Sequence, residues 1–131
     1  MGRLSSPAAV GPVILLAEDE DEVRRLVGAV LRGAGFEVVE ACGGADALDR
    51  LQGPAAGLRL LITDVAMPGM SGLELARRIA AIHPAVSILF ISGYSDPEAA
   101  ADAIELCARA EYLRKPFGPR ELLARVRGLL G

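Results

Sequence analysis

Residues 58–72, LRLLITDVAMPGMSG, begin as an apolar run of strand length and end in turn residues. Gly57 precedes the run and Pro68-Gly69 follows it, which is typical of the boundaries of a buried strand. A single carboxylate, Asp64, stands where the run gives way to the turn. An unpaired ionised carboxylate is costly inside a buried strand, whereas at the strand's carboxyl end it can face a crevice. The stretch therefore predicts a buried strand that carries one functional carboxylate at its end.

The composition favours one compact domain. The chain has 131 residues, of which 52% are hydrophobic and 24% are charged, and this balance argues against disorder. Its net charge of −3 reflects no excess of Lys and Arg, so we expect no direct nucleic-acid partner.

The ends of the chain and its cysteines indicate the compartment. We interpret residues 1–11 as a flexible leader or linker and residues 12–131 as the domain, because the first stretch is small and polar and lacks the apolar core of a signal peptide. No apolar run approaches the roughly 18 residues that cross a bilayer. Cys42 and Cys107 lie far apart without metal-site spacing, so we expect two small buried hydrophobes in a reducing cytoplasm.

Strand-like runs and helical patterns alternate five times along the chain. Besides the opening stretch, the runs cover residues 13–17, 36–40, 86–91 and 111–114. The helical patterns cover residues 21–33, 45–51, 72–82, 96–109 and 119–130. Alternation with short connections predicts an α/β domain whose parallel sheet is joined by right-handed crossovers.

Polar side chains stand at the carboxyl ends of four of these predicted strands. They are Glu18 and Asp19, then Asp64, then Ser92, then Lys115. In parallel α/β sheets such ends share one edge, and three carboxylates there would repel one another without a cation. A hard divalent ion such as Mg²⁺ prefers oxygen ligands, and an aspartate held beside it can act as a nucleophile that forms an aspartyl phosphate.

Four motifs resemble the receiver domain of two-component response regulators over roughly residues 12–130. They are Ala17-Glu18-Asp19-Glu20, the acceptor stretch 62–72, Phe90-Ile91-Ser92-Gly93-Tyr94, and Tyr112-Leu113-Arg114-Lys115-Pro116-Phe117. The resemblance implies a flavodoxin-like, doubly wound, five-stranded parallel sheet of order 2-1-3-4-5 with helices on both faces. It also implies a phosphoacceptor switch in a phosphorelay.

By this resemblance, Asp64 accepts a phosphoryl group from a phosphohistidine on a sensor histidine kinase or histidine phosphotransfer protein. Asp19 would ligate Mg²⁺ directly and Glu18 through water. Asp64 and the backbone carbonyl of Ala66 would complete the protein ligands.

The resemblance also assigns the groups that respond to phosphorylation. Lys115 would contact the phosphoryl group, and its bond to Pro116 is often cis in this family. Ser92 would hydrogen-bond a phosphoryl oxygen while Tyr112 rotates inward, which would change a partner-binding face at about residues 96–130. A homodimer is a further alternative that the sequence leaves open.

Three positions depart from the family pattern. Ala66 lacks a polar side chain, which leaves the magnesium site intact and should affect how long Asp64 keeps its phosphate. Ser71 stands where many members have Asp, in a loop that we expect to be tolerant. The Ser92-Gly93-Tyr94 form is similar to receivers attached to hybrid sensor kinases.

Two other functions remain open from the sequence. A phosphatase of the haloacid-dehalogenase type also uses a strand-end Asp and Mg²⁺, but it normally has a second acid two residues later, where this chain has Ala66. A pseudo-receiver would act only as a binding module, although all the acids are present. The leading hypothesis is a receiver that is not an enzyme in its own right.

Overall fold

The computed structural model describes residues 13–51, 57–93 and 110–131. The leader at 1–11, Tyr94, Cys107 and the helix expected over 96–109 lie outside the described residues. Within these ranges no helix is long and apolar enough to span a membrane.

The described strands form one five-stranded parallel sheet in the order β2-β1-β3-β4-β5, as the sequence analysis expected. The strands are β1 (Val13–Ala17), β2 (Glu37–Ala41), β3 (Leu58–Asp64), β4 (Ser87–Ser92) and β5 (Ala110–Arg114). The helices are α1 (Asp21–Gly33), α2 (Gly44–Arg50), α3 (Gly72–Ile82) and α5 (Pro119–Leu130). Each bound falls within about two residues of the sequence expectation, which is the usual uncertainty of element ends.

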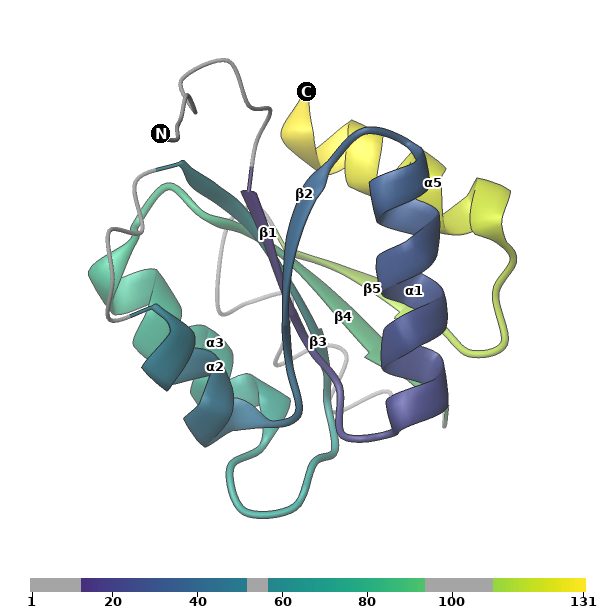
Figure 1. The fold of residues 1–131 in the computed structure, drawn as a ribbon. Coiled ribbons are helices and arrows are strands. Elements are labelled where there is room, and N and C mark those ends of the chain that lie inside the picture. The colour runs from purple at the N-terminus through teal and green to yellow at the C-terminus, as the bar shows by residue number, and fades with distance from the viewer. Residues whose placement is uncertain (1–12, 52–56, 94–109) are drawn as a thin grey trace, which may run out of the picture.

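The sheet is covered on both faces, with α1 and α5 on one side and α2 and α3 on the other (Figure 1). Side chains alternate along each strand, so neighbouring residues enter different cores. In β1, Ile14 and Leu16 pack toward α1 and α5, whereas Leu15 and Ala17 pack toward α2 and α3. Burial on both faces explains why the central strands read as continuous apolar runs.

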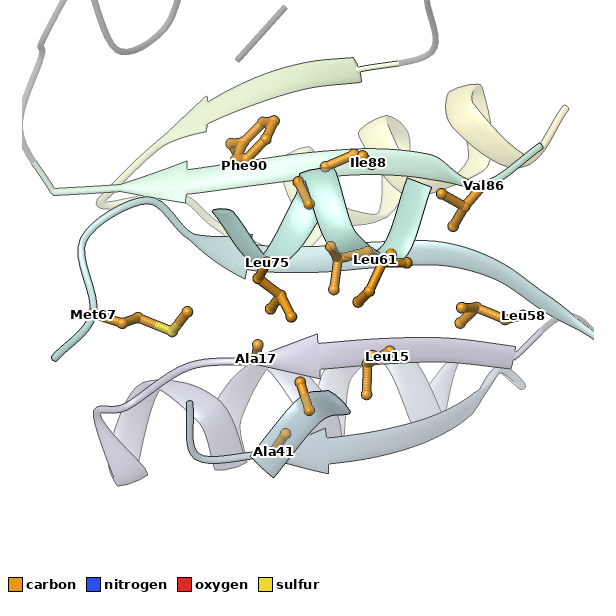
Figure 2. Close-up of a cluster of buried hydrophobic side chains, with 13 residues drawn as sticks. Leu15, Ala17, Ala41, Leu58, Leu61, Met67, Leu75, Val86, Ile88 and Phe90 are labelled. Atoms are coloured by element: carbon orange, nitrogen blue, oxygen red, sulfur yellow. The ribbon is translucent and has the colours of Figure 1, made fainter. Parts of the chain in front are cut away.

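Figure 2 shows the core beneath α2 and α3, where side chains of the three central strands meet those of α3. Phe90, Ile88, Leu61 and Leu75 are fully buried in it. Met67, from the loop after β3, is 9% exposed and covers the end of this core that lies nearest the carboxyl ends of the strands. The loop that follows Asp64 is therefore anchored by packing.

Three side chains lie differently from the sequence expectation. Leu26 and Ile82, which the helical pattern places on inward faces, are 67% and 61% exposed. Leu26 lies in the second turn of α1 beside the buried Val27, and Ile82 is the last residue of α3. Cys42 is exposed, so its assignment as a buried hydrophobe is wrong. Cys42 follows β2, an edge strand of the described sheet, and its backbone N–H donates a hydrogen bond to the carboxylate of Asp46 at 2.9 Å.

Candidate functional site

Backbone hydrogen bonds extend the strand pairing one residue beyond the ends of three strands. Glu18 N–H donates to Ala41 O at 3.1 Å, and Val65 N–H donates to Ile91 O at 3.0 Å. Lys115 N–H donates to Ser92 O at 2.7 Å. These bonds hold the residues after β1, β3 and β5 at one edge of the sheet, so the polar strand ends meet as the topology requires.

Lys115 follows β5, and its side chain is bonded to three carboxylates at this edge. Its Nζ donates to Asp64 Oδ2 at 2.8 Å, to Glu18 Oε1 at 3.0 Å and to Glu20 Oε1 at 3.3 Å. The Asp64 and Glu18 side chains are almost completely buried, whereas that of Glu20 is 64% exposed. One ammonium group therefore joins two buried acids and one acid at the solvent boundary.

Asp64 is held through both of its carboxylate oxygens. Oδ2 accepts from Lys115, and Oδ1 accepts the backbone N–H of Ala66 at 3.0 Å. The neighbouring hydroxyl of Thr63 donates to the Asp64 backbone carbonyl at 3.0 Å. These contacts fix the orientation of the Asp64 carboxylate.

Burial and charge act in opposite directions on this cluster. Burial raises the pKa of Glu18 to about 7, and the opposing hydrogen bonds from Glu20 N–H and Lys115 do not cancel that effect. For Lys115, burial alone would lower the pKa, but the hydrogen bonds and negative charges of Asp64 and Glu18 outweigh it and raise the pKa above its usual value. Lys115 therefore stays charged, and its ammonium group is shared among the carboxylates.

The loop that carries the acids is tied to α1 and to the edge strand. Arg24 donates to the backbone carbonyl of Glu18 at 2.9 Å, and its guanidinium also contacts Asp21 at 2.6 Å. The same group lies 3.5 Å from Glu40 of β2. Arg24 is 13% exposed, so it is a partly buried brace for the Glu18–Glu20 loop.

Helix α3 begins directly after the loop that follows Asp64. Gly72 N–H donates to Val65 O at 2.9 Å, and the Ser71 hydroxyl accepts from Glu74 N–H at 3.2 Å. Ser71 is thus the N-cap of α3. This role predicts tolerance at position 71 among residues that can cap a helix, which include both Ser and Asp.

Most of the residues expected at the site lie at this edge. Asp64, Glu18 and Lys115 are in direct contact, and the peptide bond between Lys115 and Pro116 is cis, in agreement with the expectation. Ser92 is 8% exposed at the end of β4, and Tyr112 is partly buried in β5. Their proposed movements, the ligand role of Asp19 and that of the Ala66 carbonyl stay predictions.

The sequence analysis gave Glu20 no role, yet its carboxylate joins the cluster. Oxygen atoms of Glu18, Glu20 and Asp64 lie within 4.8 Å of one another, and among the described residues Asp19 does not belong to that group. The spacing of Glu18 and Glu20 could have indicated this, because alternate side chains of an extended segment share a side.

The donor set fits a hard divalent cation. It consists of carboxylate oxygens alone, from Glu18, Glu20 and Asp64. The ammonium group of Lys115 is bonded to all three carboxylates and can offset only one negative charge. Mg²⁺ binds such sites through one or two carboxylates and retains several waters. The acidic cluster could therefore hold a metal ion.

Comparison with known proteins gives one family. The chain matches the model of the response regulator receiver domain over residues 14–127. The response regulator receiver protein CpdR from Brucella abortus (strain 2308) is 39% identical over 117 residues, which cover 89% of this chain and 95% of CpdR.

Two further similarities agree with this match. The sensor kinase CckA from the same organism is 34% identical over 117 residues, which cover 89% of this chain but 12% of CckA. The solved structure of the chemotaxis protein CheY4 from Vibrio cholerae has a TM-score of 0.83 at 29% identity, and the alignment covers 92% of this chain and 100% of that one.

Proposed function

Because this chain belongs to the response regulator receiver domain family, the phosphoacceptor modules of two-component signalling, we propose that Asp64 is its phosphoacceptor. The observation that carries the proposal is the position of Asp64 at the end of the central strand β3. There its carboxylate accepts a hydrogen bond from Lys115 and lies beside the carboxylate of Glu18. No other aspartate among the described residues is bonded to Lys115.

The transfer follows from the directions in which the Asp64 oxygens are held. One carboxylate oxygen attacks phosphorus, the bond from phosphorus to the donor's leaving atom breaks, and the leaving group departs with its electron pair. The ammonium group of Lys115 then offsets charge on the phosphoryl oxygens, while Ala66 N–H keeps the other carboxylate oxygen in place. A divalent ion held by these acids would supply further positive charge to offset the charge that develops on the phosphoryl oxygens.

Asp19, with Glu18 acting through water, is our choice of metal ligands alongside Asp64 and the Ala66 carbonyl. The oxygen-only cluster at the edge of the sheet supports Glu18 and Asp64, whereas Asp19 is supported by its place between Glu18 and Glu20 in the acidic loop and by the receiver pattern. Ser92 and Tyr112 are our choice for the groups that move on phosphorylation, since both belong to the strands beside the site.

The donor that we propose is a phosphohistidine on a sensor histidine kinase or histidine phosphotransfer protein. Membership of the receiver family supports this class of partner. The downstream partner at about residues 96–130, a homodimer and a cytoplasmic location stay predictions, and 96–109 lies outside the described residues. We expect Asp64 to be phosphorylated once and then dephosphorylated slowly. Unlike a phosphatase, the domain should not turn over a phosphomonoester substrate.

Labelling by a small phosphodonor tests the assignment. Wild-type protein incubated with Mg²⁺ and acetyl phosphate should gain one acid-labile phosphoryl group by intact mass, and Asp64→Asn should gain none. Asp49→Asn, which removes an exposed acid of α2, is the matched control and should be labelled like wild type. A label retained by Asp64→Asn would contradict the assignment, and steady turnover of a phosphomonoester would favour the phosphatase instead.

A further inference from the structure

Glu20 stands where a side chain normally caps a helix, but its carboxylate has a different partner. It is the N-cap residue of α1, with extended backbone angles and no side-chain capping bond. An N-cap side chain ordinarily accepts from an N–H of the first turn. Here the Glu20 carboxylate turns to Lys115, 3.3 Å from Nζ.

The contact between Glu20 and Lys115 adds little to the stability of the fold. Lys115 already has two shorter bonds to buried carboxylates, and the Glu20 side chain is 64% exposed. Exposed ion pairs contribute little to folding because water screens them and their side chains lose entropy. The position of the Glu20 carboxylate is therefore not explained by a contribution to folding.

Glu20 adds a negative charge beyond those that Lys115 and one divalent cation would balance. Glu18, Asp19 and Asp64 together carry three negative charges, which Lys115 and one divalent cation would balance. Glu20 adds a fourth at the solvent boundary, beside the lysine that an incoming phosphoryl group must reach. An approaching anion thus meets a largely exposed carboxylate that shares the ammonium group of Lys115 with two buried acids.

We propose that Glu20 is a specificity-determining residue that disfavours small, highly charged phosphodonors at Asp64. A dianion such as acetyl phosphate loses more from the repulsion than a donor with one negative charge less. A protein donor can bring a cation of its own to Glu20, which a small dianion cannot. The inference rests on the proposed function of Asp64.

The reactions to compare differ in donor charge but form the same bond. With acetyl phosphate, phosphorus bonds to an Asp64 oxygen as its bond to the acetate oxygen breaks, and acetate leaves. With phosphoramidate, which carries a net single negative charge at neutral pH, the phosphorus–nitrogen bond breaks and ammonia leaves. If a substitution of Glu20 changes the structure of the site, both reactions are affected equally, and that effect cancels in the ratio of their rates.

The experiment measures labelling rates with both donors for wild type, Glu20→Gln and Glu22→Gln in the presence of Mg²⁺. Glu22 is a matched control because it is an exposed acid of the same segment that is not bonded to Lys115. Glu20→Gln should raise the acetyl phosphate to phosphoramidate rate ratio about fivefold at low salt. High salt should reduce that change, since it screens exposed charges. Glu22→Gln should leave the ratio within about twofold of wild type.

A ratio unchanged in Glu20→Gln would overturn the inference while leaving Asp64 as the acceptor. An equal loss of rate with both donors would also overturn it, because Glu20 would then act by positioning Lys115. Mg²⁺ affinity, measured by thermal shift without any donor, gives an independent readout. It should stay within about threefold of wild type, and a loss above tenfold would make Glu20 a metal ligand instead. A wild-type protein that neither donor labels would overturn the proposed function as well.

Discussion

Helix α3 begins so close to β3 that a Cβ atom on Gly72 would overlap the backbone carbonyl oxygen of Asp64. The obstacle is backbone, which cannot swing aside as a flexible side chain can. The first residue of α3 therefore has to be glycine for the loop after Asp64 to close as it does. The first residue of α3 therefore lies directly against the backbone of the proposed phosphoacceptor, Asp64.

Gly72→Ala should consequently lower the free energy of unfolding by about 2 kcal/mol, because it overpacks the end of β3. We expect Mg²⁺ to bind more weakly as well, since Asp64 must shift. Urea unfolding and a Mg²⁺ thermal shift measure the two effects. Gly128→Ala in α5 is the control, because among the described residues no atom beyond its chain neighbours and its own helix backbone lies within 4 Å of the added Cβ. This variant should stabilise the helix by about 0.5–1 kcal/mol.

Ser71→Ala should lower the free energy of unfolding by about 1 kcal/mol, because Glu74 N–H loses the hydroxyl that accepts its hydrogen bond. Ser71→Asp keeps an acceptor at the N-cap and should retain wild-type stability. Chemical denaturation of both variants checks this. Equal losses in the two variants would mean that the cap has no part in the effect.

Lys115→Met should destabilise the metal-free protein by about 3 kcal/mol, because it leaves the buried carboxylates of Glu18 and Asp64 without a cation. Mg²⁺ should recover more stability in this variant than in wild type, since it then supplies the missing positive charge. The measurement is urea unfolding at pH 8 with a chelator and with Mg²⁺. Arg77→Met, which removes an exposed cation of α3, should show neither effect.

Glu18 should make the metal-free protein less stable as the pH rises from about 5 to 8. Its pKa is about 7 in the folded protein, because burial disfavours the charged form, against 4.5 for the ordinary side chain. Between these values the folded state holds a proton that the unfolded state has released, so the contribution is complete below pH 4.5 and is lost as the pH passes 7.

Glu18→Gln should remove about 2 kcal/mol of this pH dependence. Glu22→Gln, an exposed acid nearby, should not change it. Unfolding curves in a chelator over this pH range provide the comparison. A variant with the same slope as wild type would show that Glu18 is not the group that titrates.

The order of apolar runs, turns and strand-end residues was enough to predict the α/β class and the place of Asp64, Glu18 and Lys115 at one edge. Those features depend on local patterns, because buried parallel strands must be apolar and their carboxyl ends must share an edge. The strand order 2-1-3-4-5 came from the family resemblance. Exposure was less predictable: Leu26, Ile82 and Cys42 follow plausible patterns, yet all three are exposed, because burial depends on which neighbouring elements cover each side chain.

The sequence by itself determined which residue types stand at each strand end, and hence the kind of chemistry the edge can support. Only the tertiary structure decided which atoms meet there. It brought the Glu20 carboxylate to Lys115, placed Arg24 on the Glu18 carbonyl, and left no room for a Cβ at Gly72. The contact between Glu20 and Lys115 joins residues 95 positions apart, so it depends on how the sheet brings its strands together. The other two contacts are closer in sequence, but they depend on how α1 and α3 pack against the strand ends.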